Sequence, residues 1–336
     1  MRLVINEPGS FLGVKQGMIT VKKGGKKVAE VAPPKIKLVA ILTRGASFSS
    51  AFLRLLAKHR IPLIVYNSFG LPVSITIYPR RGGLKLRREQ RGAQGDGRGA
   101  ALAKAFVHGK IRNQRALIYS MAKNRRRSNP SQAKSLREAS WELKEYAKRA
   151  LSVEGGLGEA RGALVEVEAS AAKVYWDAVK EALPEELGFP GRRKRFEDPR
   201  DPVNVSLNYL YTVLAGEVWL NLECSGFDPY VGFLHADSPR RPALAMDLME
   251  EFRQPVVDRA VFKLVYERKL RGALEGGKLR REARFALYKS FSERLRAKVT
   301  FRNRALPLES HVLLQARRLG AFLLGHSPSY EPYVEW

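Results

Sequence analysis

The sequence predicts an α+β fold, in which a small β domain containing one helix precedes a larger helical domain. Three observations support this prediction. Residues 1–79 contain short apolar runs separated by turn-forming segments, residues 80–98 lose all periodicity, and the chain from residue 100 onward places apolar side chains at helical spacing. A chain of 336 residues is long enough for two domains, each with its own core.

Residues 1–79 are expected to form mostly strands. Their apolar runs are short and are bounded by the segments EPGS, KKGGKK and APP. One helix interrupts them in FSSAFLRLLAKH, where Ser49 or Ser50 is placed to cap the first turn. The predicted strands are Arg2–Ile5, Gly17–Lys22 and Ile36–Leu42, followed by the segments IPLIVYN and LPVSITIYP.

Residues 80–98 (RRGGLKLRREQRGAQGDGR) are predicted to be a basic linker or mobile loop, because Gly and Arg dominate there. From Arg80 to Arg127 the chain has 15 Lys and Arg residues against two acidic ones. A solvated connector is one interpretation, but contact with nucleic acid is favoured for the block as a whole. Arg125, Arg126 and Arg127 are its candidate DNA contacts.

Residues 99–336 are predicted to be an all-α domain. Apolar residues recur at helical spacing in one segment after another. Gly188–Pro190 is expected to end the third of these helices, and Pro255 to break or kink the fifth. The predicted helices cover residues 101–124, 135–152, 157–183, 205–225, 248–270, 281–299 and 309–325.

The charge of the chain predicts a polyanionic partner. Lys and Arg total 60 against 33 Asp and Glu, a formal net charge of +27. Such an excess suits nucleic acid, because each neutralised phosphate releases counterions; a membrane surface is the competing interpretation. The sequence shows neither an apolar run of membrane-spanning length nor a signal peptide, so we expect a soluble cytoplasmic protein. Cys224 is the only cysteine, which excludes an intrachain disulfide and a cysteine-based zinc site.

Glu168 is a candidate functional carboxylate within the segment GALVEVEASAAKVYW. Its neighbours at i+3, i+4 and i+7 are Ala171, Ala172 and Tyr175, which share its helical face. A carboxylate on a face of small residues is costly to bury unless a positive charge pairs with it. Exposure to solvent and a buried ion pair with an Arg are the structural alternatives. Glu166 is a rival, and the spacing leaves that choice open.

His235 is the second candidate, and an acidic cluster follows it. Asp247 and Glu250 are three residues apart and can face the same way on a helix, and Glu251 is close by. A lone His before a turn is more often structural, and these acids also suit a solvated helix start. The functional alternative joins His235, one of these carboxylates and Glu168 in a three-ligand site. Carboxylates with one imidazole suit Mg²⁺ or Mn²⁺ better than zinc.

Such an ion would neutralise the charge that develops on a phosphodiester and activate a water or a DNA hydroxyl as the nucleophile. Arg240 and Arg241 lie beside this stretch in the sequence. They are candidates to hold a phosphate, with a solvated loop as the equal alternative.

At these residues the chain resembles the Cas1 family, the CRISPR-associated endonuclease and integrase of spacer acquisition. The resemblance spans nearly the whole length. EASAAKVYW is similar to the family's first metal-ligand motif, and GFLH with DLMEEFRQPVVDR to its second and third. DPVNVSLNYLYTVL is similar to the helix before the His, and FSSAFLRLLAKHRIPLIVYNSFG to the amino-terminal domain.

The resemblance implies a small amino-terminal β-sandwich domain, used for dimerisation and partner contacts, followed by a larger all-α catalytic domain. It implies a homodimer that assembles with the small partner protein Cas2. The implied activity depends on Mg²⁺ or Mn²⁺. In it, a 3′ hydroxyl of a captured DNA fragment attacks the CRISPR repeat by transesterification. The implied metal ligands and catalytic residues are Glu168, His235 and Glu250, with Asp247 in a supporting role. Some relatives carry Asp where this chain has Glu250.

Two other functions remain open at the level of sequence. One is a structure-specific nuclease for branched DNA that does not integrate. The other is a non-catalytic DNA-binding scaffold that uses only the basic surface. A scaffold has no need of an acidic cluster in so cationic a protein, so Glu168, His235 and Glu250 together favour an enzyme.

Overall fold

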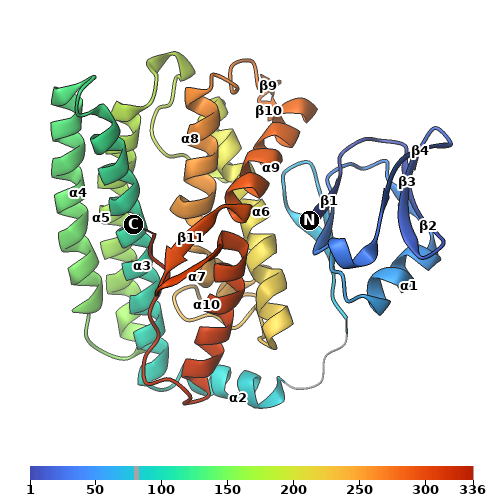
Figure 1. The fold of residues 1–336 in the computed structure, drawn as a ribbon. Helices are drawn as coiled ribbons and strands as arrows, with labels where there is room; N and C mark the ends of the chain where they lie inside the picture. The colour runs from blue at the N-terminus through green and yellow to red at the C-terminus, as the bar shows by residue number, and fades with distance from the viewer. Residues whose placement is uncertain (79–82, 336) are drawn as a thin grey trace. The chain divides into compact units, whose positions relative to one another are not determined.

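The computed structural model describes residues 1–78 and 83–335, and the chain divides into two compact units, 1–81 and 82–336 (Figure 1). The first unit is rich in strands, and the second is mostly helical. This agrees with the predicted α+β class. No helix in the described part of the chain combines the length and hydrophobicity needed to cross a membrane.

The first unit contains two four-stranded sheets. In one, three parallel strands are joined at one edge by an antiparallel one, in the order β1-β5-β7-β8. The other has the order β4-β3-β2-β6. The strands are β1 (Arg2–Ile5), β2 (Ser10–Lys15), β3 (Met18–Lys23), β4 (Lys26–Val31), β5 (Leu38–Ile41), β6 (Ser47–Phe48), β7 (Leu63–Tyr66) and β8 (Pro72–Thr76). The strands predicted in this region are confirmed to within a few residues.

Both sheets and helix α1 (Ser50–Lys58) contribute to one core. Leu12 of β2, Val39 of β5 and Phe52 of α1 are fully buried in it. The Ser49 side chain accepts a hydrogen bond from Phe52 N, so the predicted cap is Ser49 and not Ser50. The two-sheet arrangement is consistent with a β-sandwich, which stays a prediction.

The second unit is built from long helices (Figure 1). Helices α3, α4 and α5 pack against one another, and α6 packs against α7 and α10. The helices are α2 (Leu84–Gly92), α3 (Gly97–Arg125), α4 (Pro130–Leu151), α5 (Leu157–Ala182), α6 (Pro202–Ser225), α7 (Ala243–Met249), α8 (Arg259–Tyr266), α9 (Arg281–Arg296) and α10 (Leu308–Leu323). The predicted helices are confirmed, although α5 ends at Ala182 because Pro184 follows, not at Gly188.

The predicted linker over 80–98 is wrong for its described part. Residues Leu84–Gly92 form α2, and α3 begins at Gly97 with Asp96 as its cap. The residues 80–82 of that prediction lie outside the described residues. The face of α2 carries Leu86 and Gln90, four residues apart and both buried. Packing of these two side chains against the rest of the second unit therefore stabilises α2, although the composition of α2 is typical of a loop.

The prediction of an all-α second domain also needs correction. Two antiparallel hairpins lie among the helices: β9 (Leu274–Glu275) with β10 (Lys278–Leu279), and β11 (Lys298–Phe301) with β12 (Arg304–Pro307). The predicted break in the helix at Pro255 is confirmed, and it takes the form of an irregular helical turn. The chain there forms the π-helical turn η4 (Arg253–Asp258) between α7 and α8. Such turns are rare and often mark functional sites.

Residues after α10 form a tail that returns to α3. Tyr333 is fully buried and stacks on Phe252, with ring centroids 5.0 Å apart. A Cβ added at Gly109 of α3 would lie 2.6 Å from the Pro332 side chain, so the tail approaches α3 more closely than any larger residue would allow. The tail is thus part of the packed second unit.

Candidate functional site

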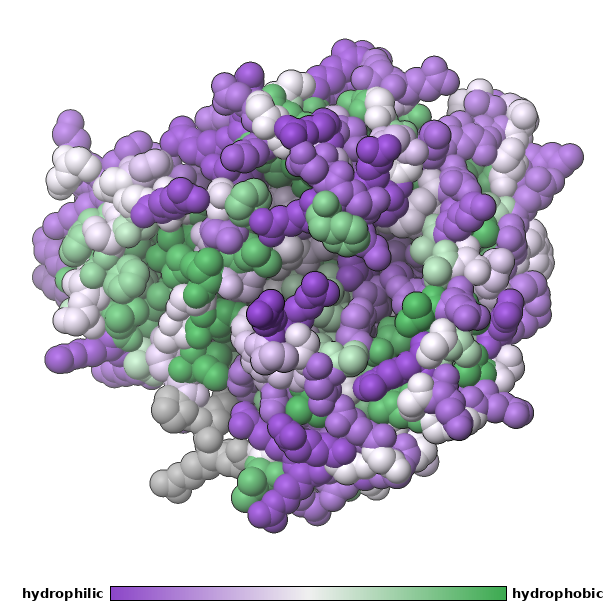
Figure 2. All heavy atoms as spheres, turned by 180° about the vertical axis from the view of Figure 1, so that it is seen from behind, coloured by the Kyte–Doolittle hydropathy of each residue, from purple (hydrophilic) through white to green (hydrophobic). Residues whose placement is uncertain are grey.

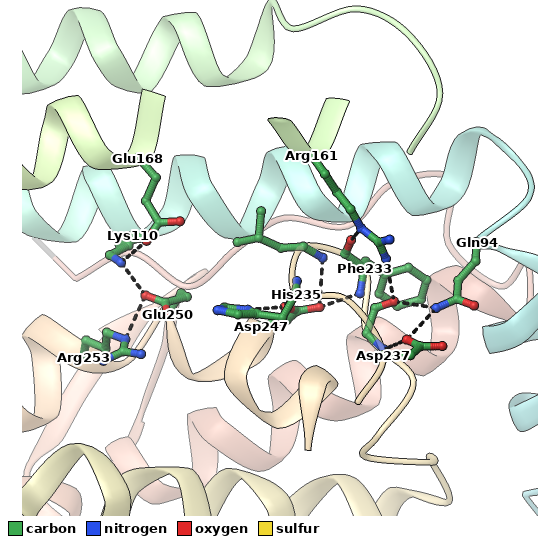
Figure 3. A network of polar contacts seen from close by, with 12 residues as sticks. Gln94, Lys110, Arg161, Glu168, Phe233, His235, Asp237, Asp247, Glu250 and Arg253 are labelled. Atoms are coloured by element: carbon green, nitrogen blue, oxygen red, sulfur yellow. Dashed lines mark hydrogen bonds and ion pairs between the residues drawn. The ribbon is translucent and has the colours of Figure 1, made fainter. Parts of the chain in front are cut away.

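Glu168 and Glu250 meet at the ammonium group of Lys110. Glu168 belongs to α5, Lys110 to α3, and Glu250 follows the last residue of α7 (Figure 3). Lys110 Nζ donates to Glu168 Oε1 and lies 2.7 Å from Glu250 Oε2. Three helical segments that are far apart in the sequence therefore contribute to one charged cluster.

Glu250 is held ionised in a buried position. Its side chain is only 2% exposed, and Arg253 Nε lies 2.8 Å from its Oε2 atom. Burial by itself would raise the pKa of Glu250, but the charges of Arg253, Lys110 and His235 lower it to about 2. The site thus keeps a fully charged carboxylate at neutral pH.

The positive charge of Lys110 likewise depends on its two carboxylate partners. Burial alone would lower the pKa of Lys110, but the charges of Glu168 and Glu250 outweigh that effect and raise it. Glu168 is half-buried and faces Lys110, whereas Glu166 is exposed. Of the two glutamates that the spacing left open, Glu168 is therefore the one that α5 directs to the charged cluster, and its functional role stays a prediction.

His235 is fixed by Asp247. His235 Nδ1 lies 2.7 Å from Asp247 Oδ1, and the same carboxylate accepts backbone N–H groups of Phe233, Leu234 and His235 at 2.6, 3.0 and 2.8 Å. Asp247 is completely buried. With Nδ1 used in this way, the other ring nitrogen of His235 is the one left to bind a ligand.

The ring of His235 lies between Asp247 and Glu250 (Figure 3). Burial by itself would lower the pKa of His235, but the hydrogen bond and charge of Asp247, followed by the charges of Glu250 and Glu168, raise it. Lys110 thus joins Glu168 to Glu250, and the His235 ring, held by Asp247, lies on the side of Asp247 that faces Glu250.

The loop that carries His235 is held from two other elements. Arg161 Nε of α5 donates to Phe233 O at 2.6 Å. Gln94, between α2 and α3, donates to Gly232 O at 2.8 Å and to Asp237 Oδ1 at 2.9 Å (Figure 3). The loop is also tight at Gly232, where an added Cβ would lie 2.6 Å from His235 O. These contacts leave His235 little freedom to move.

Glu251 faces away from this charged cluster into the packed interior. Tyr330 Oη, Tyr333 N and Gln315 Nε2 donate to its carboxylate at 2.6, 2.7 and 2.9 Å. Burial raises the pKa of Glu251 to about 7, even though these hydrogen bonds work in the opposite direction. Glu251 thus joins the tail to the segment that carries Glu250.

A layer of aromatic and cationic groups lies next to Arg253. The Arg253 guanidinium lies over the ring of Tyr211, 4.5 Å from its centroid. Tyr211 Oη and Tyr175 Oη donate to the buried Asp258 at 2.5 and 2.6 Å. Burial raises the pKa of Asp258 to about 6. This layer fixes the orientation of the second cation at Glu250.

The arginines predicted to contact DNA take no part in the ion pairs described above for Glu168 and Glu250. Arg240 and Arg241 are exposed in the turn after the His235 loop. Arg125 Nη2 donates to Ala182 O at 2.9 Å and to Tyr266 Oη at 2.5 Å, so its guanidinium is used within the fold. Arg126 and Arg127 are exposed beyond it. Arg125 is about 22 Å from Lys110 along α3.

Lys110 and Arg253 are the site residues that the sequence did not reveal. Lys110 has one indication in its surroundings: it interrupts a helix whose other positions are largely buried, in the stretch AFVHGKIRNQRALI. An ionisable residue in such a helix needs an opposite charge. Arg253 has no indication of this kind, because it sits in an irregular turn where helical spacing fails.

Comparisons with known proteins identify the family of this chain. Residues 3–294 match the family model described as CRISPR associated protein Cas1. The chain is 40% identical to the CRISPR-associated endonuclease Cas1 1 of Archaeoglobus fulgidus over 347 residues, which cover 100% of this chain and 99% of that protein. It is 35% identical to a CRISPR-associated endonuclease Cas1 1 of Thermus thermophilus, with 100% of both chains covered.

Solved structures share the fold at lower identity. A casposase bound to integration product superposes with a TM-score of 0.80 at 22% identity, covering 98% of this chain and 92% of that one. A CAS1 protein from Thermotoga maritima gives 0.74 at 20% identity, with 99% of both chains covered. A chain of a Cas6-RT-Cas1–Cas2 complex gives 0.75 at 21% identity, with 100% of this chain and 36% of that chain covered. The family model and the full-length relatives together show that this chain belongs to the Cas1 family of CRISPR-associated proteins.

Proposed function

We propose that this protein is a metal-dependent DNA endonuclease and integrase that inserts captured DNA fragments into a CRISPR array. One observation carries the proposal: Glu168 and Glu250 share a single cationic group beside His235. The relatives named CRISPR-associated endonuclease Cas1 support nuclease chemistry, and the casposase supports strand transfer.

The residues of the site fit a divalent cation. In the part of the chain that the structure describes, no three His, Cys, Asp or Glu side chains are already gathered as a metal cluster. The positive charge between the two glutamates is that of Lys110. The donor set consists of two carboxylates and one imidazole, and the second nitrogen of that imidazole is hydrogen-bonded to a carboxylate. Such a set suits Mg²⁺ or Mn²⁺. Glu168, Glu250 and His235 would hold the ion.

The chemistry follows from this donor set. A bound Mg²⁺ or Mn²⁺ supplies charge for the phosphate oxygens in the transition state and lowers the pKa of the attacking hydroxyl. Asp247 keeps His235 in the orientation that presents its free nitrogen, and Lys110 and Arg253 keep Glu250 ionised. The 3′ oxygen of the fragment bonds to the target phosphorus while the target's own P–O bond breaks. With water as the nucleophile, the same site cleaves the strand.

We also propose that the partners are DNA, a second copy of the chain and the small protein Cas2. The net charge of +27 supports DNA, and the Cas6-RT-Cas1–Cas2 neighbour supports Cas2. Exposed apolar side chains support protein contacts in the first unit, where hydrophobic residues gather on the left of Figure 2. The exposed apolar residues of this unit include some on and beside the edge strand β8, namely Phe69, Leu71, Val73 and Ile77.

A strand-transfer assay tests the proposal. It combines the protein, a labelled fragment with free 3′ ends, a supercoiled plasmid carrying a repeat, and Mn²⁺ or Mg²⁺, with and without Cas2. Glu168→Gln and His235→Ala are expected to abolish metal-dependent joining but leave DNA binding intact. Glu166→Gln is the matched control, because Glu166 is exposed two residues away on the same helix.

The outcomes separate the alternatives. Full activity in both Glu168→Gln and His235→Ala would show that the site is wrong. Cleavage of branched DNA without any joining would favour a structure-specific nuclease. DNA binding without chemistry under either metal would favour a non-catalytic scaffold.

A further inference from the structure

Lys110 occupies an unusual position for a lysine. Its side chain is only 12% exposed, and its ammonium group contacts the two carboxylates that the proposed function assigns to a metal ion. Arg253 contacts Glu250 but makes no contact of this kind with Glu168 among the ion pairs that the structure describes. Lys110 is therefore the group that links α3, α5 and the end of α7 at this point.

We propose that Lys110 is an internal substitute for the metal ion, which holds Glu168 and Glu250 together in the metal-free protein and must leave when a divalent cation binds. This inference rests on the proposed function, because it takes Glu168 and Glu250 to be metal ligands. It assigns Lys110 a positioning role and makes it a determinant of metal affinity.

The geometry carries the proposal because the ammonium and a metal ion need the same oxygen atoms. Lys110 Nζ lies 2.7 Å from Glu250 Oε2 and closer to Glu168 Oε1, so it fills the position between them. A lysine ammonium is a compact charge on a flexible four-carbon stem, and it can move while α3 stays fixed.

The exchange has a cost and a benefit. Without a cation, the buried Glu250 and the half-buried Glu168 would repel each other and lose hydration, so Lys110 stabilises the metal-free protein. The metal binds only to the state that Lys110 has left, and its apparent affinity falls by the fraction of molecules in that state. Lys110 thus lowers the apparent metal affinity but keeps the two carboxylates in place before the metal binds.

Mn²⁺ titration calorimetry on wild type, Lys110→Met and Lys123→Met tests this inference. Met matches the length of Lys without its charge, and Lys123 is exposed near the end of the same helix. Lys110→Met is expected to bind Mn²⁺ about tenfold more tightly than wild type, because the competitor is gone. Lys123→Met should bind as wild type does. In thermal melts, Lys110→Met should be less stable than wild type in EDTA and gain more from Mn²⁺.

The result that overturns the inference is equal or weaker Mn²⁺ binding by Lys110→Met, since a purely structural lysine would leave the ligands misplaced when removed. This differs from failure of the proposed function. If neither wild type nor Lys110→Met binds Mn²⁺, the metal site itself is wrong, and the inference falls with it.

A second measurement needs no variant. Amine acetylation of the wild-type protein, read residue by residue by mass spectrometry, is expected to label Lys110 poorly in EDTA and several-fold more with Mn²⁺, because the ammonium is then released from the carboxylates. Lys123 should label equally in both conditions. Labelling of Lys110 that stays the same or falls with Mn²⁺ would count against the exchange.

Discussion

Glu250 and Glu251 are neighbours in the sequence and both are buried, but their pKa values are shifted in opposite directions. Glu250 is surrounded by cations, and the charges of Arg253, Lys110 and His235 bring its pKa down to about 2 despite burial. Glu251 is surrounded by the neutral donors Tyr330, Gln315 and Tyr333 N, and burial brings its pKa up to about 7. The difference arises from the groups around each side chain, which are cations at Glu250, including Arg253 three residues further along, and neutral donors at Glu251.

The comparison shows how one short segment carries two tasks. The cation-paired carboxylate keeps a charge that chemistry can use, and the carboxylate held by neutral donors ties the segment to the rest of the fold. Asp258, which accepts from Tyr175 and Tyr211, belongs to the second kind and likewise has a raised pKa.

Exchanging each glutamate for glutamine gives the largest expected contrast. Glu250→Gln removes a proposed metal ligand, so metal-dependent cleavage and joining should fall at least about 100-fold, since even residues behind a ligand cost up to that much. Glu251→Gln keeps the shape and should lower the rates far less. Single-turnover kinetics with Mn²⁺ measures both. Equal losses in the two variants would erase the distinction.

The tail should matter for stability more than for chemistry. Tyr330→Phe removes a hydrogen bond to Glu251 within the interior, so the free energy of unfolding should fall by about 2 kcal/mol, as for hydrogen bonds to charged groups. Urea denaturation gives the value. Tyr119→Phe is the control, because Tyr119 is more than half exposed. A Tyr330→Phe protein as stable as the control would mean that the tail does not secure Glu251.

Part of this division was visible in the sequence, and the rest was not. Glu168 stood out on a helical face of small residues, and His235 stood out before an acidic cluster. The choice between Glu250 and Glu251 could not come from periodicity, because α7 ends at Met249 and the chain turns into the π-helical segment η4. Family resemblance, not spacing, singled out Glu250.

The elements that the sequence missed are stabilised by contacts distant along the chain. Helix α2 has a polar, arginine-rich sequence, yet Gln90 donates to Asp228 O and Val231 O across the fold. The hairpin of β11 and β12 turns at Arg302 and Asn303, which both have positive φ. No glycine stands at these two positions, so the sequence lacks the usual signal for such a turn. Lys110 was hidden because its two partners lie on other elements.

The pH dependence of stability tests the carboxylates held by neutral donors. The pKa of Asp258 is about 6 in the folded protein against 3.8 as the ordinary value. The folded state thus binds a proton more tightly, and this contribution is present below pH 3.8 and lost as the pH rises through 6. Relative to Asp258→Asn, wild type should lose about 2 kcal/mol of unfolding free energy between pH 4.5 and 7.5. Urea denaturation of both proteins at each pH checks this; a constant difference would show that Asp258 is charged throughout.

The smallest effect is expected where a neutral donor positions a residue of the charged cluster. Gln94 Nε2 donates to Gly232 O and Asp237 Oδ1, while Arg161 donates to the next carbonyl of the His235 loop at 2.6 Å and to Gly232 O at 3.5 Å. Gln94→Ala should therefore loosen His235 without removing it, lowering the metal-dependent rate and the Mn²⁺ affinity by about tenfold or less. Gln132→Ala is the matched control, since Gln132 of α4 donates to Glu181 O of α5 in an exposed position.

Two results would contradict this last expectation. A loss as large as that of His235→Ala would mean that Gln94 takes a direct part in the chemistry. A rate equal to that of Gln132→Ala would mean that Asp247 and Arg161 alone position the imidazole. An intermediate loss would show that the segment between α2 and α3, whose composition resembles a linker, acts on the site through two hydrogen bonds from one uncharged side chain.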